Sequence, residues 1–163
     1  MRKMLPVVML LALAAPLAAK DSLGVFSGWG AFRDATVPRC YAIAMPAASR
    51  AARDFEPFAT IATWPKHGIR GQVHFRLSRQ LAKGARISLQ IGRQSFRLTG
   101  GGADAWSADR RMDAAIVAAM RSATSMALSA TDSAGRRFTN SYSLGGAATA
   151  MDAATVACSR SSR

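Results

Sequence analysis

The chain has 163 residues and a formal net charge of +13 at pH 7, with 22 lysines and arginines against 9 acidic residues. That length can bury a core without metal or disulfide staples, which excludes the smallest classes of domain. The charge favours anionic partners such as lipopolysaccharide, acidic glycans, nucleic acid or acidic proteins. The alternative is a compositional origin, because arginine far outnumbers lysine and alanine is abundant, as GC-rich coding DNA produces.

The start of the chain has the layout of a secretory signal peptide. Arg2 and Lys3 give a charged start, an apolar stretch follows over 5–15, and small residues lead up to Ala19. The apolar stretch is shorter than the roughly 20 residues that span a bilayer. We expect cleavage after residue 19, which leaves one soluble globular domain over 20–163 in the periplasm or outside the cell. A retained N-terminal anchor is the alternative.

Short strands are predicted along the first half of this domain. Leu23–Arg33 is rich in Val, Phe and Trp and is predicted as one strand, with a bulge or a close backbone approach where Gly28 and Gly30 flank Trp29. Arg39–Met45 alternates, so every second residue from Cys40 to Ala44 is small. That small-residue face leaves room for another element to lie close against the strand.

Strand patterns continue after a connection over 45–57 that lacks apolar periodicity. Phe58–Trp64 is the next predicted strand, and three strongly alternating segments follow it at 70–78, 85–91 and 95–99. Apolar residues lie on one side of these three segments, and polar or basic residues lie on the other. The pattern is typical of an antiparallel meander with one face in solvent.

The second half of the domain contains two predicted helices and a hairpin. Gly100–Gly102 is interpreted as a flexible break in the sheet. Ser107 or Asp109 then caps a helix over 109–122, which carries an apolar stripe. The remaining elements are a hairpin and a C-terminal helix: 125–132, 136–144 and 147–158. The predicted fold class is therefore mainly β with two helices (α+β), an antiparallel, β-sandwich-like domain with the C-terminal helix packed on it.

Cys40 and Cys158 are the two cysteines of the chain. Cys158 falls on the apolar stripe of the C-terminal helix, and Cys40 lies on the small-residue face of its strand. An oxidising compartment allows such a pair to form a disulfide. Closing so long a loop is worth roughly 4–5 kcal/mol on the chain-entropy model. The alternative is two free thiols buried as small apolar groups.

Several segments resemble the invasion-associated locus B family, a group of small exported proteins from alphaproteobacteria. They are SGWGAF, RCYAIA, RGQVHFRLS, DAAIVAAMRS and YSLGGAATAMDAA, followed by the closing cysteine. The resemblance covers nearly the whole predicted domain and implies export and a β-rich fold, without a known enzymatic activity. Family members often carry additional cysteines in the central region, and this chain has none between Cys40 and Cys158. The resemblance therefore supports compartment and fold rather than a role in host-cell entry.

No segment has the pattern of an active site, a metal site or a cofactor site. The two histidines, His67 and His74, are predicted to be surface residues rather than catalytic bases. Asp109 and Asp113 lie one helical turn apart, which we attribute to pairing with adjoining arginines. Three tryptophans are expected to pack rather than to form a carbohydrate-stacking platform: Trp29, Trp64 and Trp106.

These patterns predict a non-enzymatic binding or envelope-accessory protein whose partner is an anionic envelope component or a periplasmic protein. Arginine forks suit phosphate and carboxylate groups. The candidate anion-binding residues lie on the polar strand face: Arg70, Gln72, His74, Arg76, Arg86 and Arg97. No aromatic residue is interleaved among them in the sequence, so no specific nucleic acid is expected.

Three alternatives to this interpretation remain open. The first is a binder of anionic glycan or lipopolysaccharide through this basic face. The second is an ordinary solvated sheet face. The third is a small envelope hydrolase or enzyme inhibitor. An enzyme predicts a polar cluster with His67 or His74 in a cleft, whereas a binding module predicts a shallow arginine surface.

Overall fold

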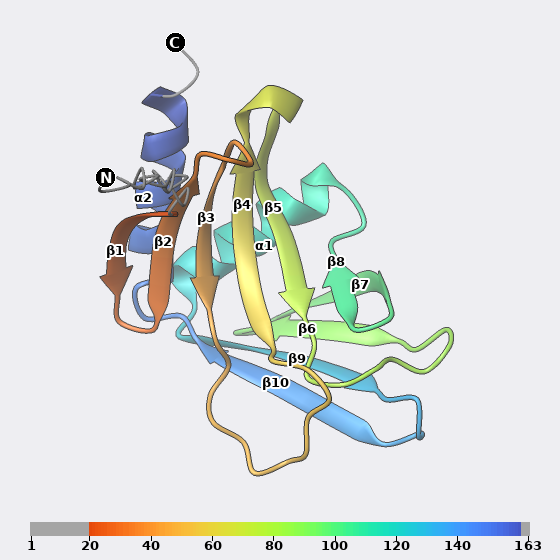
Figure 1. Ribbon diagram of the computed structural model, residues 1–163. Coiled ribbons are helices and arrows are strands. Elements are labelled where there is room, and N and C mark those ends of the chain that lie inside the picture. The colour runs from red at the N-terminus through yellow and green to blue at the C-terminus, as the bar shows by residue number, and fades with distance from the viewer. Residues whose placement is uncertain (1–19, 161–163) are drawn as a thin grey trace, which may run out of the picture.

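The computed structural model describes residues 20–160, so the predicted signal peptide lies outside the described residues. The chain forms a mainly antiparallel β structure with two helices in the described part, which confirms the predicted fold class (Figure 1). The elements are β1 (Asp21–Phe26), β2 (Trp29–Asp34), β3 (Arg39–Ala44), β4 (Phe58–Trp64), a 3-10 turn (Pro65–His67), β5 (Ile69–Arg76), β6 (Ile87–Ile91), β7 (Gln94–Gly101), β8 (Asp104–Trp106), α1 (Arg110–Ser122), β9 (Ser125–Thr131), β10 (Arg137–Ser143) and α2 (Ala147–Arg160).

All these strands belong to one sheet in the order β1-β2-β3-β4-β5-β8-β7-β6-β9-β10. Strands β1–β5 stand upright, and β6, β9 and β10 run crosswise below them (Figure 1). The two halves therefore enclose a common core. The Phe75 ring of β5 lies 6.0 Å from the Tyr142 ring of β10. The Trp29 indole of β2 donates a hydrogen bond of 2.9 Å to the Ser143 carbonyl.

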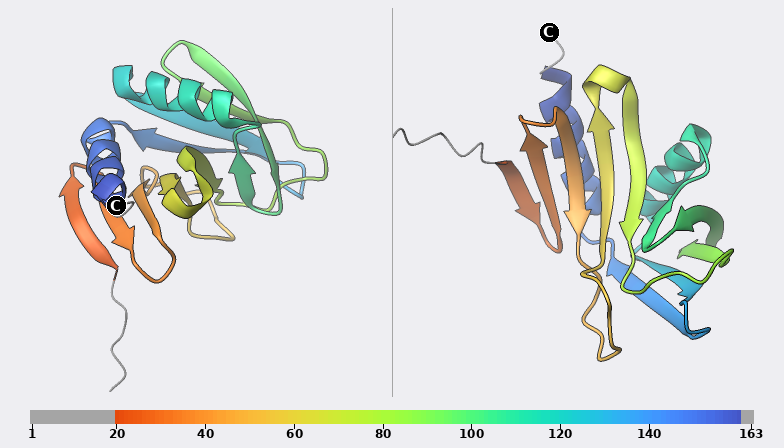
Figure 2. Two further views of the ribbon diagram at one scale, coloured as in Figure 1. Left: turned by 90° about the horizontal axis from the view of Figure 1, so that it is seen from above. Right: turned by 45° about the vertical axis from the view of Figure 1, so that its right-hand side comes forward.

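Both helices lie on the side of β1–β5 that faces β9 and β10 (Figure 2). Helix α2 packs on β1–β4, because the small residues predicted on β3 let it approach closely. Its Cys158 is bonded to Cys40 with an S–S distance of 2.07 Å, which confirms the predicted bridge. Helix α1 packs mainly on β5. The Arg121 guanidinium of α1 contacts Asp152 of α2 at 2.6 Å and holds the pKa of that carboxyl below its usual value.

Two strand predictions were wrong. Leu23–Arg33 is a hairpin rather than one bulged strand, because the chain reverses at Ser27, whose φ is 52°. The predicted meander is interrupted, because β8 lies between β5 and β7 and pairs with both. The bulge was inferred from the glycines that flank Trp29 and the meander from local alternation, and neither pattern specifies the partner of a strand.

The triple glycine is not a break in the sheet. Gly100 and Gly101 belong to β7, and Gly102 turns the chain into β8 with a φ of 63°. A Cβ atom on Gly100 would lie 2.4 Å from the backbone oxygen of Asp104. Glycine therefore serves here for close approach of two strands and for a tight turn.

The capping prediction for α1 is confirmed, but the explanation of its second acid was wrong. The Asp109 carboxylate accepts a hydrogen bond from the Met112 amide at 2.8 Å, as an N-cap does. Asp113 is buried and accepts hydrogen bonds from the Val73 amide and the Ser107 hydroxyl. Asp113 therefore fastens α1 to β5 instead of pairing with surface arginines.

Candidate ligand-binding face

The outer side of β2–β5 and β8, opposite the helices, carries a set of rings that we call the aromatic face. Register places the rings in rows, because directly paired residues of antiparallel strands point to the same side. Phe32 pairs with Tyr41, and His74 pairs with Trp106. No described helix or strand covers this side of β1–β5 (Figure 2). The rings of the aromatic face are Phe32, Tyr41, Phe58, Trp64, His74 and Trp106.

Trp106 is the most exposed large ring of the aromatic face. Its side chain belongs to β8, and 39% of the residue is accessible to solvent. The His74 ring stacks on it with centroids 5.2 Å apart and an interplanar angle of 25°. The same His74 ring also contacts the Phe58 ring edge-on, with centroids 5.7 Å apart. The His74 ring thus covers one face of the indole, while part of the Trp106 side chain stays open to a ligand.

Asp104 joins the polar groups beside Trp106. Its carboxylate lies 2.9 Å from Nε2 of His74 and 2.6 Å from the Arg76 guanidinium. The same guanidinium lies 4.5 Å from the centroid of the Phe55 ring. Arg76 is therefore fixed by one carboxylate and one ring, and its remaining N–H groups are in reach of solvent because a third of its side chain is exposed.

A second arginine is held among rings further along the aromatic face. The Arg39 guanidinium lies 4.7 Å from the Tyr41 centroid and 5.3 Å from the Trp64 centroid. Such cation–π contacts orient the guanidinium, and the Asp34 carboxylate lies 3.8 Å from its Nε. The Trp64 indole donates a hydrogen bond of 3.0 Å to the Gln72 side-chain oxygen. Arg39 and Arg76 thus give the aromatic face two preorganised cations.

The structure brings three of the six candidate anion-binding residues together. Gln72, His74 and Arg76 share the outer side of β5. Arg97 lies on the same side of β7 as Thr99, which is the register partner of Trp106.

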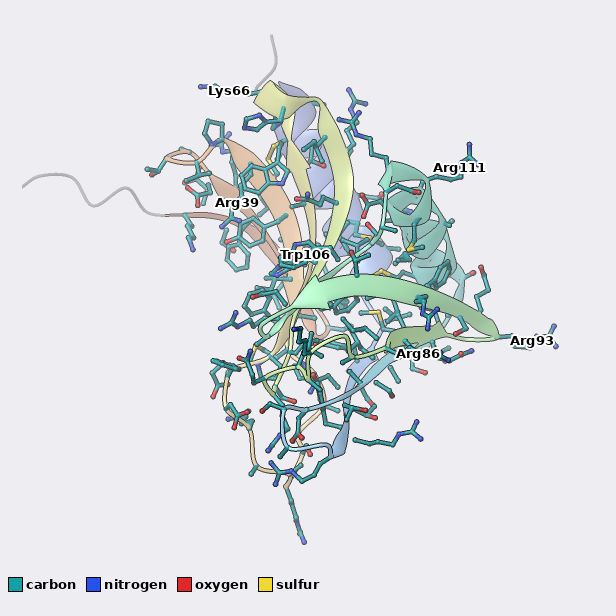
Figure 3. All side chains as sticks on the ribbon, turned by 90° about the vertical axis from the view of Figure 1, so that its right-hand side faces the viewer. Arg39, Lys66, Arg86, Arg93, Trp106 and Arg111 are labelled. Atoms are coloured by element: carbon teal, nitrogen blue, oxygen red, sulfur yellow. A yellow bond between two sulfur atoms is a disulfide. The ribbon has the colours of Figure 1, made fainter. Side chains whose placement is uncertain are left out.

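The two remaining candidates lie elsewhere. Arg70 lies at the start of β5 and lines a small cleft with residues near the C-terminal end of α2. Arg86 directly precedes β6, at the end of the β6–β7 hairpin opposite the turn that carries Arg93 (Figure 3). The predicted basic face is therefore divided, and its central part is also aromatic.

Two interpretations from the sequence change at this site. Aromatic residues are interleaved with the candidate residues after all, because β8 and β4 bring Trp106 and Phe58 alongside His74. Of the three tryptophans expected to pack, Trp29 is fully buried, whereas Trp64 and Trp106 lie on the outer side. The only local signal for β8 was the three-residue segment Asp104–Trp106, which is too short for a strand pattern.

His74 belongs to a polar cluster, but the cluster lies on an open sheet surface. The 45–57 loop and β10 form a cleft of about 480 Å³, and neither His67 nor His74 lines it. The ring of His74 bonds to Asp104, whereas the nearby Thr60 hydroxyl bonds to the backbone carbonyl of His74. The arrangement orients an imidazole, and within the described residues it does not place a hydroxyl or thiol nucleophile against that ring.

No family model, curated protein or solved structure matches this chain. The resemblance to the invasion-associated locus B family therefore stays a prediction. Within residues 20–160, no helix has the length and hydropathy of a membrane span. The same part of the chain contains no cluster of three or more side chains able to hold a metal ion.

Proposed function

We propose that this protein is a non-enzymatic, exported binding module that holds an anionic glycan of the bacterial envelope on its aromatic face. The observation that carries the proposal is the Trp106 indole, exposed but held in place by His74, with the Arg76 guanidinium fixed beside it. An indole next to a guanidinium offers a glycan both an apolar contact surface and directed hydrogen-bond donors.

Stacking supplies the first part of the binding energy. The apolar face of a sugar ring packs on an aromatic plane, and a rigid indole loses little conformational freedom when it binds. The His74 contact on one side and the sheet beneath keep Trp106 in one orientation. The ordering of this side chain is therefore complete before the ligand arrives.

Charge supplies the second part. Guanidinium groups bind carboxylate, sulfate and phosphate groups in a bidentate manner. Arg76 has one carboxylate neighbour, Asp104, at 2.6 Å. Arg39 also has one, Asp34, at 3.8 Å, and it contacts two rings as well. Because basic residues also exceed acidic ones in the rest of the chain, these two arginines favour an acidic glycan over a neutral one.

The compartment is part of the same proposal. The signal-peptide layout, the Cys40–Cys158 disulfide and the resemblance to small exported alphaproteobacterial proteins support the periplasm or the cell exterior. N-terminal sequencing of the protein from cell fractions tests this part. We expect Lys20 as the first residue in the periplasmic or extracellular fraction, and Met1 retained on membrane-bound protein would contradict it.

Affinity measurements against a glycan panel test the binding function. Heparin, polygalacturonate and purified lipopolysaccharide are the anionic probes, and dextran is the neutral probe. We expect binding to at least one anionic probe and a loss of about tenfold or more for Trp106→Ala. Arg76→Gln should weaken binding less, and the weakening should shrink as salt rises, because screening reduces charge contacts.

Arg111→Gln is the matched control, since Arg111 is exposed at the start of α1, away from Trp106 (Figure 3). If Trp106→Ala binds every probe as the parent does, the rings merely cover the outer side of the sheet and the proposal fails.

A further inference from the structure

A second basic site lies on the opposite side of the 45–57 loop from the aromatic face. The loop is anchored at both ends: the Ala47 amide donates to the Ser141 carbonyl at 2.7 Å, and the Asp54 amide donates to the Ser78 carbonyl at 2.7 Å. Between these anchors, the loop and β10 enclose a cleft of about 480 Å³. This volume falls in the range of small-molecule sites.

The cleft is lined by more positive than negative charge. Its lining contains four arginines and one carboxylate: Arg53, Arg79, Arg136, Arg137 and Asp132. About 60% of the side chains of Arg53 and Arg136 is exposed, whereas only 2% of the Asp132 side chain is exposed. A ligand entering the cleft thus meets guanidinium groups, while the one acidic group is covered.

Asp132 is the centre of a buried network that shapes this wall. Its carboxylate accepts hydrogen bonds from the backbone amides of Ala134 and Arg136, at 3.0 and 2.8 Å. It also contacts the guanidinium groups of Arg79 at 2.7 Å and Arg136 at 3.1 Å. The four contacts compensate the burial of the carboxylate. Because one negative charge is shared by two arginines, the network keeps an excess positive charge.

Arg79 ties the same network to the loop. A guanidinium nitrogen of Arg79 donates to the Ala52 carbonyl at 2.6 Å, so the loop and the turn at Asp132 are held together. Arg137 follows in β10, and its side chain has no carboxylate partner within residues 20–160. Arg53 contacts only the exposed carboxylate of Glu56, at 3.1 Å. These two arginines are therefore available to a ligand without disturbing the buried pairs.

We propose that this cleft binds a small soluble sugar that carries a phosphate or carboxylate group, independently of the glycan on the aromatic face. The arginines supply the charge-assisted hydrogen bonds for the anionic group. The partly apolar lining from Met45, Pro46 and Phe138 supplies a surface for the sugar ring. No ring of the aromatic face lines this cleft, so each of the two proposals can be tested independently of the other.

Isothermal titration with glucose 6-phosphate, glucuronate and glucose tests the proposal. We expect at least one of the two anionic sugars to bind at low salt, while glucose gives no heat. The double variant Arg53→Gln/Arg137→Gln should weaken binding about tenfold or more, since it removes two charged donors. It keeps the Asp132 network intact, so thermal denaturation should show an unchanged fold.

Two variants serve as controls. Arg93→Gln, at the tip of the β6–β7 hairpin, removes the same kind of charge away from the cleft (Figure 3). Trp106→Ala removes the centre of the aromatic face. Both should bind the anionic sugars as the parent does.

Either of two results would overturn the proposal: no binding of either anionic sugar at millimolar concentration, or parental affinity in the double variant. Phosphatidylglycerol vesicles present the same phosphate chemistry on a lipid. Binding to those vesicles without binding to glucose 6-phosphate or glucuronate would also contradict a soluble sugar ligand.

Discussion

At the scale of single residues, Tyr142 is an unusual buried group. Its ring packs against Phe75 in the core, and its hydroxyl makes no hydrogen bond among the described residues. Burial raises the pKa of this phenol well above its ordinary value of 10.0. An unpaired buried hydroxyl costs about 1–3 kcal/mol in folding. The residue therefore weakens the fold at a point where phenylalanine would fit.

We predict that Tyr142→Phe leaves the free energy of unfolding unchanged or raises it by up to about 1 kcal/mol at neutral pH. The advantage should grow above pH 10, because the unfolded tyrosine ionises there while the folded one stays neutral. Urea denaturation at pH 7 and pH 10.5 measures both effects. A loss of more than about 1 kcal/mol at pH 7 would show that the hydroxyl has a partner, such as buried water.

Gly100 and Gly101 offer a matched pair for testing the β7–β8 hairpin. A Cβ atom on Gly100 would lie 2.4 Å from the Asp104 oxygen and 2.6 Å from Ile87, whereas Gly101 has open space. We predict that Gly100→Ala lowers the free energy of unfolding by about 1–3 kcal/mol. Gly101→Ala should change it by about 0.5 kcal/mol or less. Equal effects in thermal or urea denaturation would contradict the close approach of these strands.

At the scale of elements, the sequence predicted the strands and helices whose formation depends on local patterns. The alternation of 39–45 predicted β3, and the stripe ending at Cys158 predicted both the C-terminal helix and the side on which its sulfur lies. The sequence pattern could not predict β8. That strand has three residues, and it forms because it pairs with β5 on one edge and with β7 on the other. Asp104 and Trp106 of the candidate site were hidden for this reason, because β8 supplies both.

The disulfide is the device that joins the last element to the first half of the sheet. It links Cys40 of β3 to Cys158 of α2 across a sequence separation of 118. We predict that Cys40→Ala/Cys158→Ala lowers the free energy of unfolding by roughly 4–5 kcal/mol, because the unfolded chain regains its loop entropy. Urea denaturation of the oxidised parent and the double variant checks this value. A difference below about 1 kcal/mol would show that α2 is held by packing alone.

At the scale of the whole molecule, the bent sheet places the core on one side and the proposed binding face on the other. The inner side of β1–β5 is occupied by α1, α2 and the crosswise strands, so the core and the disulfide lie there. The outer side carries rings and arginines, centred on Trp106 and Arg76, that the core does not need. The 45–57 loop divides that side from the cleft at β10. One domain thus offers two basic surfaces of different shape.

Amide NMR shifts measured during titration with heparin oligosaccharide test the central claim most directly. We expect the largest shifts on the outer positions of β4, β5 and β8, around Phe58, His74 and Trp106. Trp106→Ala should remove them, while shifts elsewhere stay small. Shifts concentrated on α1 and α2, or a parental pattern in the Trp106→Ala variant, would contradict a binding site on the aromatic face.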